Sequence, residues 1–225
     1  MGRLLRNQSQ RMSQHGDLLT GNFEWNGKIV LIGASTGGVE AIETILAEFP
    51  RNCPPTLIAQ HMPEKFLRAF ACRLNQRILP DVLLAKHGLP VAQGQVCLAP
   101  GGATHLELFS DIKLCCQIGT YEKVNGYRPS IDVLFKSATP IADSVVGILL
   151  TGMGTDGAKG LLSLRNCGAI SIAQDEASSA VYGMPRAAVA IGAVRHQLGL
   201  PQIAAFVLSS CSKAHTDVSA REVSE

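Results

Sequence analysis

The chain has 225 residues, which is enough for one sizeable hydrophobic core. Hydrophobic residues make up 46% and charged residues 17%, a balance typical of a compact globule that argues against a disordered or coiled-coil protein. The net charge is only +2 and the basic residues form no stripe, so we expect no nucleic-acid binding.

Cysteine usage and the ends of the chain indicate the cellular compartment. Seven cysteines are present, an odd number, and none forms a C-x-x-C pair. Reduced thiols are therefore expected, with no metal site and no cofactor. The N-terminus lacks the apolar stretch of a signal peptide, and no run approaches membrane-spanning length. We expect a cytoplasmic protein without membrane insertion.

The chain is expected to hold one domain between two tails. Residues 1–26 are polar and without sustained periodicity, and we interpret them as an N-terminal tail or linker. Residues 213–225 are similar and are interpreted as a C-terminal tail. The domain would occupy residues 27–212.

Short apolar runs and helical patterns alternate through this region. The expected strands are runs at 29–32, 56–59, 82–85, 96–99, 145–150 and 169–173. Expected helices include 39–49, a stretch lined by Phe66, Phe70 and Leu74, and a stretch lined by Ile131, Leu134, Phe135 and Ala138. Further helices are expected over 157–167 and from Pro185 and Pro201. This alternation predicts a doubly wound α/β fold, a mostly parallel sheet with helices on both faces (a Rossmann-like three-layer sandwich). The segment 106–119 is expected to form an antiparallel hairpin at one edge.

The loop after the first expected strand reads Gly-Ala-Ser-Thr-Gly-Gly over residues 33–38. Its G-x-S-x-G pattern places Ser35 on a sharp strand-to-helix turn, where the helix N-terminus favours an oxyanion. Ser35 is therefore a candidate nucleophile. The alternative is that Ser35 or Thr36 caps the following helix.

The same glycines also resemble the nucleotide loop of short-chain dehydrogenases. That family needs a Tyr-x-x-x-Lys pair, but Tyr121, Tyr127 and Tyr182 are followed four residues later by Asn125, Ile131 and Arg186. No acidic residue directly follows the run at 56–59, where a ribose partner would stand. A nucleotide-dependent oxidoreductase is therefore disfavoured.

Two further strand-end loops carry polar side chains. His61 directly follows the run at 56–59, and Asp156 lies in the glycine-rich loop after the run at 145–150. Because parallel strands end at one edge of a sheet, both lie level with Ser35. His61 is suited to accept the serine proton, and Asp156 to orient the imidazole. The alternatives are a hydrogen-bonded loop histidine and an aspartate that caps the next helix.

Read together, these loops resemble the protein-glutamate methylesterase family of bacterial chemotaxis, the CheB catalytic domain. The resemblance covers roughly residues 28–208, and its stretches occur in family order at 32–38, 60–63, 98–101, 128–135, 150–157, 174–178 and 183–186.

The resemblance implies a triad of Ser35, His61 and Asp156 in a serine esterase, a carboxylic ester hydrolase. The substrates would be methylated glutamates on the cytoplasmic helical region of chemoreceptors, with glutamine deamidation (protein-glutamine glutaminase) as a second activity. Thr36 and the backbone N–H groups near Met153 are candidates for the oxyanion hole. Family members usually carry an N-terminal receiver domain, for which the first 26 residues leave no room, so we expect none attached in this chain. The competing hypothesis is a non-catalytic receptor- or partner-binding module on the same fold.

Overall fold

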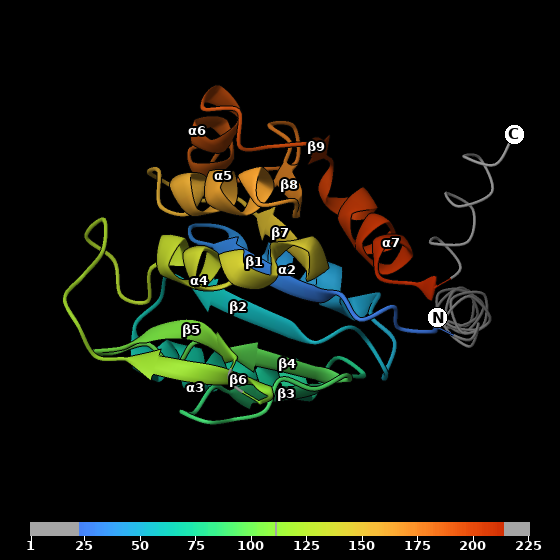
Figure 1. Cartoon of the computed structure of the whole chain (residues 1–225). Coiled ribbons are helices and arrows are strands. Elements are labelled where there is room, and N and C mark those ends of the chain that lie inside the picture. The colour runs from blue at the N-terminus through green and yellow to red at the C-terminus, as the bar shows by residue number, and fades with distance from the viewer. Residues whose placement is uncertain (1–22, 111, 214–225) are drawn as a thin grey trace, which may run out of the picture.

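The computed structural model describes residues 23–110 and 112–213, which form a seven-stranded sheet, helices on both faces and a separate hairpin (Figure 1). The strand order is β3-β4-β2-β1-β7-β8-β9 and all neighbouring pairs are parallel. The strands are β1 (Ile29–Ala34), β2 (Thr56–Gln60), β3 (Asp81–Leu84), β4 (Gln95–Leu98), β7 (Val145–Leu149), β8 (Ile170–Gln174) and β9 (His196–Leu198).

The central strands are buried on both faces, which is why the sequence shows them as unbroken apolar runs. Every residue of β1, β2 and β7 is buried. All the apolar runs expected to be strands are strands. Strand β9 was not predicted from the sequence, because this edge strand has three residues, His-Gln-Leu, none of them buried.

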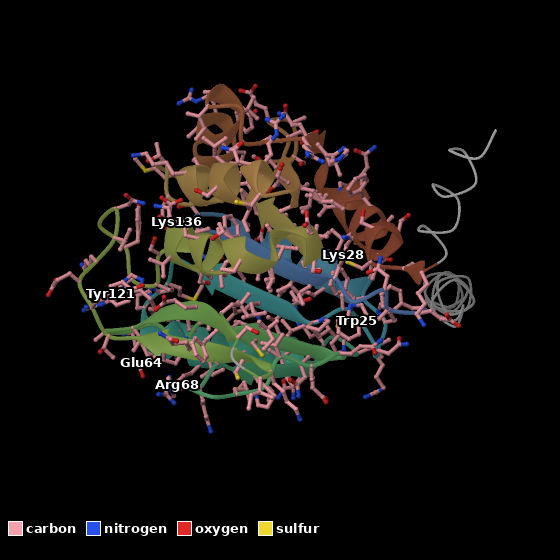
Figure 2. All side chains as sticks on the ribbon, in the orientation of Figure 1. Trp25, Lys28, Glu64, Arg68, Tyr121 and Lys136 are labelled. Carbon is pink, nitrogen blue, oxygen red and sulfur yellow. The ribbon has the colours of Figure 1, made fainter. Side chains whose placement is uncertain are left out.

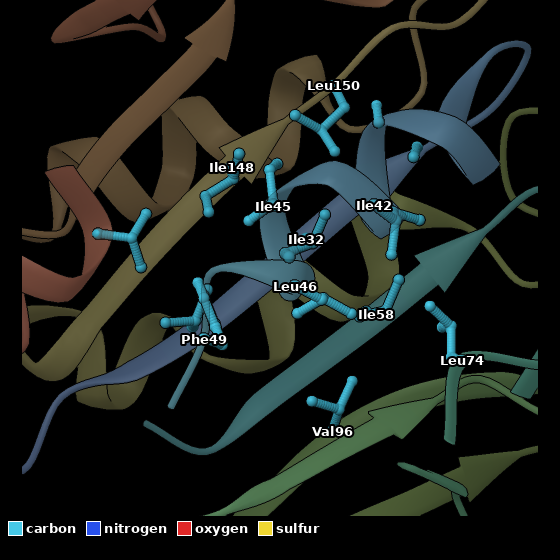
Figure 3. Packing of buried hydrophobic residues seen from close by; sticks show 14 of the residues in the cluster. Ile32, Ile42, Ile45, Leu46, Phe49, Ile58, Leu74, Val96, Ile148 and Leu150 are labelled. Atoms are coloured by element: carbon cyan, nitrogen blue, oxygen red, sulfur yellow. The ribbon is translucent and has the colours of Figure 1, made fainter. Parts of the chain in front are cut away.

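Successive residues of β1 point to opposite layers of helices. Val30 and Ile32 belong to the core beneath α2 (Gly38–Ala47), α3 (Glu64–Asn75) and α7 (Leu200–Ser210). Ile29 and Leu31 belong to the core beneath α4 (Ile131–Ser137), α5 (Ala158–Asn166) and α6 (Met184–Ala190). Figure 3 shows side chains of α2 packed against those of β1, β2 and β7 in the first core. The predicted doubly wound fold is confirmed, and a short 3₁₀ helix, η1 (Thr139–Ser144), leads into β7.

One side chain expected on the inner face of α3 lies outside. Phe66 is 51% exposed, whereas Leu67 is fully buried one position further along. The apolar face is therefore formed by Leu67, Phe70, Ala71 and Leu74. The helical period fits an apolar face that begins at Leu67 as well as one that begins at Phe66. The pattern alone could not show which of the two residues is buried.

The antiparallel hairpin is confirmed, but it does not extend the main sheet. Strands β5 (His105–Ser110) and β6 (Leu114–Gly119) pair with each other in a sheet of their own. Leu106, Leu108 and Cys116 join the core beneath α4. The hairpin therefore covers the α4 side of the domain instead of adding a strand to one edge.

The described ends of the chain lie together. Trp25 forms an antiparallel bridge with Ser212, and the Asn26 N–H donates to the carbonyl of Cys211 at 2.9 Å. The described part of the expected N-terminal tail, residues 23–26, thus lies on the domain, next to the end of α7. Residues 1–22 and 214–225, where most of the two expected tails fall, are outside the described residues. Within the described part, no helix has the length and apolarity required to cross a membrane.

The order of the strands creates one switch point. From β1 the chain moves through β2 toward the β3 edge and then returns to β7 on the other side of β1. In an open parallel sheet, the crevice at the carboxyl ends of two such strands is where sites form. The polar residues predicted from the sequence follow β1, β2 and β7.

Candidate active site

Ser35 stands directly after β1 and is held by its backbone. Its N–H donates to the carbonyl of Thr151 at 3.0 Å, which links the end of β1 to the end of β7. The turn needs glycine at Gly37, whose φ is +79°, since a side chain is strained in that conformation. Gly37 is the N-cap of α2, and no side chain caps this helix. The alternative in which Ser35 or Thr36 serves as a helix cap is therefore wrong.

His61 follows β2 in register with Ser35. Ala34 and Gln60 are paired in the parallel ladder, so the nucleophile candidate and the histidine each come one residue after that pair. The His61 N–H donates to the carbonyl of Ala34 at 3.0 Å. The buried Gln60 amide also donates to the carbonyls of Ser35 and His61, at 2.9 and 3.1 Å. One side chain thus ties the two loops together.

Asp156 reaches His61 from the loop after β7. Its Oδ2 lies 2.9 Å from Nε2 of His61, and the two side chains are 0% and 6% exposed. The N-cap of α5 is Gly157, not Asp156, and no side chain caps that helix. The expectation that Asp156 orients the imidazole agrees with this contact, and the alternative of a plain helix cap does not.

The remaining acceptor positions of Asp156 are also used. Oδ1 accepts from the Ser130 hydroxyl and the Asn125 amide, both at 2.8 Å, and Oδ2 accepts from the Ile131 N–H at 2.7 Å. Burial by itself raises the pKa of Asp156, but the hydrogen bonds from His61, Asn125, Ile131 and Ser130 outweigh it and hold the pKa below its ordinary value. The carboxylate is therefore ionised at neutral pH.

The bond to Asp156 determines which nitrogen of His61 is free. Nε2 is engaged, whereas Nδ1 is buried and has no hydrogen-bond partner among the described residues. An ionised carboxylate accepts hydrogen bonds, so Nε2 carries the proton and Nδ1 is the basic nitrogen. In the chymotrypsin triad the carboxylate holds Nδ1 and the serine faces Nε2. Here the carboxylate holds Nε2 instead.

The loop after β7 also packs closely against Ser35. A side chain at Gly152 would place its Cβ 2.6 Å from Cβ of Ser35 and 2.6 Å from Sδ of Met184, so only glycine fits. The Thr151 hydroxyl donates to the carbonyl of Thr36 at 2.9 Å and accepts from the Val181 N–H at 2.9 Å. Of the two oxyanion candidates, Thr36 is exposed and Met153 is 69% exposed. Their role stays a prediction.

Several residues of the site carry no role predicted from the sequence. Gln60 and Ser130 belong to the stretches that carry the family resemblance, whereas Asn125 (after Tyr121) and Tyr127 (before Ile131) occur in two tyrosine spacings that do not fit the dehydrogenase pair. Tyr127 stacks on His61 with ring centroids 3.8 Å apart and planes 3° apart. The Asn-Gly dipeptide at 125–126 could have indicated some of these residues, because it predicts a tight turn that could hold neighbouring side chains in place.

Two hollows flank the site. One, of about 460 Å³, is lined by His61, Met62, Pro63, Glu64, Gly102, Lys123, Gly126, Tyr127, Arg128 and Pro129. The other, of about 730 Å³, is lined by Met153, Gly154, Thr155, Glu176, Val181, Tyr182, Gly183, Arg186, Ala187 and Ala190. Figure 2 labels Glu64 at the first hollow, with Arg68 beside it on α3, and Tyr121 at the start of the loop between β6 and α4. One hollow thus borders His61, and the other borders the loop after β7.

A parallel α/β sheet with serine, histidine and aspartate at its switch point is typical of serine hydrolases. The family model described as CheB methylesterase matches residues 30–207. The chain belongs to this family.

Relatives and a solved structure agree with that assignment. A protein-glutamate methylesterase/protein-glutamine glutaminase of Caulobacter vibrioides is 50% identical over 192 residues, covering 85% of this chain and 56% of the relative. The protein of that name from Agrobacterium fabrum is 49% identical, covering 80% and 52%. The crystal structure of the Thermotoga maritima CheB methylesterase catalytic domain matches with a TM-score of 0.78 and 33% identity, covering 81% of this chain and 98% of that one. The chain spans about half the length of the curated relatives it matches.

Proposed function

We propose that this chain hydrolyses methyl esters of glutamate side chains on chemoreceptors, with Ser35 as nucleophile. The carrying observation is the hydrogen bond between His61 Nε2 and Asp156 Oδ2, at 2.9 Å, beside a serine loop tied to His61 by Gln60. The relatives, named as methylesterases and glutaminases, supply the ester and amide chemistry. The chemoreceptor substrate comes from the family resemblance of the sequence.

The first half-reaction forms an acyl-enzyme. The Ser35 hydroxyl oxygen attacks the ester carbonyl while Nδ1 of His61 takes its proton, and Asp156 stabilises the imidazolium through Nε2. The carbonyl π electrons move to oxygen, and backbone N–H groups near Met153, with Thr36 close by, receive the resulting oxyanion. The intermediate then collapses, the bond to the methoxy group breaks, and His61 returns the proton to release methanol.

The second half-reaction restores the enzyme. A water molecule gives a proton to His61 and attacks the acyl carbonyl, and the Ser35 oxygen leaves with that proton. The product is the carboxylic acid of a glutamate side chain, which loses its proton to solvent and becomes the carboxylate. A glutamine amide passes through the same steps with ammonia as the leaving group, which accounts for the second activity in the relatives' name.

The partner we propose is the cytoplasmic helical region of a chemoreceptor. A helix lying across the site would place one methylated side chain at Ser35 and its neighbours over the two flanking hollows. Both hollows are lined by basic side chains, Lys123 and Arg128 in the first and Arg186 in the second. Each hollow also contains one acidic side chain. These charges suit a substrate surface that becomes more acidic as esters are hydrolysed.

The test is methanol release from methylated receptor fragments by the wild type and by Ser35→Ala. We expect release by the wild type and its loss in Ser35→Ala with the fold retained. The control is Ser163→Ala on α5, whose hydroxyl donates only to the Lys159 carbonyl of its own helix. Substantial turnover in Ser35→Ala would refute the nucleophile. Binding of the fragments without release by the wild type would favour the non-catalytic module.

A further inference from the structure

A tight turn in the loop between β6 and α4 brings two side chains to the site. Residues 124–127 close on themselves, with the Val124 N–H donating to the Tyr127 carbonyl at 3.2 Å and the Tyr127 N–H to the Val124 carbonyl at 3.0 Å. Asn125 and Gly126 have φ values of +55° and +83°. These are the features of a two-residue type I′ turn, for which Asn-Gly is the preferred sequence. In Figure 1 this loop extends from the hairpin at the left edge.

The first of these side chains, Asn125, contacts the aspartate of the site. Its Nδ2 donates to Asp156 Oδ1 and to Asp132 Oδ2, both at 2.8 Å. Asp132 is itself buried and fixed, because its other oxygen accepts from the Gly160 N–H at 2.6 Å. The amide therefore connects Asp156 to an anchored carboxylate at the start of α4.

The second side chain, Tyr127, covers the histidine. Its ring lies parallel to the imidazole, 3° apart in plane and 3.8 Å between centroids. The turn thus contacts both members of the His61–Asp156 pair, one through a hydrogen bond and the other through a ring face.

We propose that the 124–127 turn positions the catalytic pair, with Asn125 holding the Asp156 carboxylate and Tyr127 holding the His61 imidazole. The effect on turnover rests on the function proposed above, whereas the effect on the imidazole does not. Asn125 and Tyr127 act through their neighbours and are positioning residues.

The physical reason is that one hydrogen bond does not orient a ring. The contact at Nε2 leaves the imidazole free to tilt about that bond, which would change the direction of Nδ1. A parallel aromatic face blocks the tilt and keeps Nδ1 in one direction. Once His61 has taken the serine proton, the imidazolium also lies over the negative face of the Tyr127 ring, which is favourable. Small misplacements of reacting groups cost rates on the order of 100-fold.

The variants separate the turn from its side chains. Tyr127→Phe keeps the stacked ring, whereas Tyr127→Leu removes it. Asn125→Gly keeps the turn, because glycine accepts a positive φ, and removes only the amide. Gly126→Ala strains the turn without a clash, since its Cβ would meet nothing within 4 Å. Gly88→Ala is the matched control: φ is +77°, the Cβ space is equally empty, and the residue lies beyond β3, three strands from β1.

Three readouts test the proposal in the full chain: methanol release from methylated receptor fragments, the labelling rate of Ser35 by a fluorophosphonate, and ¹⁵N resonances of the His61 ring. We expect Tyr127→Leu, Asn125→Gly and Gly126→Ala to lower kcat and the labelling rate about tenfold or more. Gly88→Ala should stay within about twofold of the wild type, and Tyr127→Phe should restore most of the activity that Tyr127→Leu loses. The His61 ring should show one tautomer, protonated at Nε2, in the wild type and averaged nitrogen shifts in Tyr127→Leu.

Wild-type kcat, labelling and ring resonances in Tyr127→Leu and Asn125→Gly would overturn the proposal. A loss of thermal stability with unchanged ring resonances would overturn it too, because it would show a purely structural role. A wild type that releases no methanol yet labels at Ser35 would contradict the proposed substrate only, and the labelling rates and ring resonances would still decide the role of the turn.

Discussion

At the scale of single residues, the site depends on a carboxylate that is buried and still ionised. Hydrogen bonds from His61, Asn125, Ile131 and Ser130 outweigh the cost of burying Asp156 and lower its pKa. Because the folded-state pKa lies below the ordinary value of 3.8, this stabilisation is fully present above that value and is lost as the pH falls through the folded-state pKa.

Removing one donor should therefore weaken the protein and make it more sensitive to acid. Ser130→Ala takes away the hydroxyl 2.8 Å from Oδ1 and raises the pKa of Asp156. We expect a loss of about 1–3 kcal/mol in the free energy of unfolding at neutral pH, and an acid-unfolding midpoint at higher pH. Urea denaturation over a pH series measures both, with Ser163→Ala as control. An unchanged acid midpoint would contradict the assigned network.

Gly152 gives a second prediction at this scale. In Gly152→Ala the new Cβ would lie 2.6 Å from Cβ of Ser35, so the serine must move. We expect fluorophosphonate labelling of Ser35 to slow about 100-fold. Gly199→Ala is the control, because its Cβ would meet only ordinary contacts at 3.4 Å and beyond. Wild-type labelling in Gly152→Ala would show that the serine loop tolerates the displacement.

The sequence could predict the site residues that stand at strand ends but not their connections. Ser35, His61 and Asp156 each follow a recognisable apolar run, and parallel strands bring such positions to one edge. The free nitrogen of His61 depends on contacts between loops 95 residues apart in the chain, which no local pattern encodes. The bridging of Ser35 and His61 by Gln60 likewise depends on the register of β1 and β2.

At the scale of elements, hydrophobic runs predicted the buried strands and most helices. The hairpin β5–β6 was also predicted, but its separation from the main sheet was not, because its packing against α4 depends on contacts with a helix further along the chain. The edge strand β9 was missed for want of an apolar run. On α3 the predicted Phe70 and Leu74 are buried, but Leu67 is buried in place of Phe66.

The correction on α3 can be measured. Phe70 is 3% exposed and Phe66 is 51% exposed, although both lie on the same helix. We expect Phe70→Ala to cost about 3–5 kcal/mol in the free energy of unfolding, since it leaves a cavity, and Phe66→Ala to cost less than about 1 kcal/mol. Urea denaturation of the two variants gives the comparison. Equal losses would mean that Phe66 is buried as the sequence pattern had suggested.

At the scale of the whole molecule, the two helical layers shield some thiols and leave others open. Burial raises the pKa of Cys53 and that of Cys211 to about 12, whereas Cys72 and Cys167 are exposed. We expect Cys72 and Cys167 to react with a thiol reagent at about pH 8 and the buried pair to react only after unfolding, because the thiolate is the reactive form. Peptide mapping of the labelled sites checks this. Early labelling of Cys53 or Cys211 would contradict the packing of α7 on the sheet.

The doubly wound topology also explains why the site lies where it does. The loops that follow β1, β2 and β7 converge because the strand order reverses at β1, which places β2 on one side of β1 and β7 on the other. The loop between β6 and α4 contributes Asn125 and Ser130, which donate to Asp156, and Tyr127, which stacks on His61. The hairpin and α4 hold the two ends of that loop.

We propose that Ser35 is a nucleophile activated by His61. To test this, the folded protein is treated with a fluorophosphonate and the adduct is mapped by mass spectrometry, in the wild type and in His61→Ala. We predict a single adduct on Ser35 in the wild type and labelling that is strongly slowed in His61→Ala. An adduct on another serine, or equal labelling of Ser35 in both proteins, would contradict the claim.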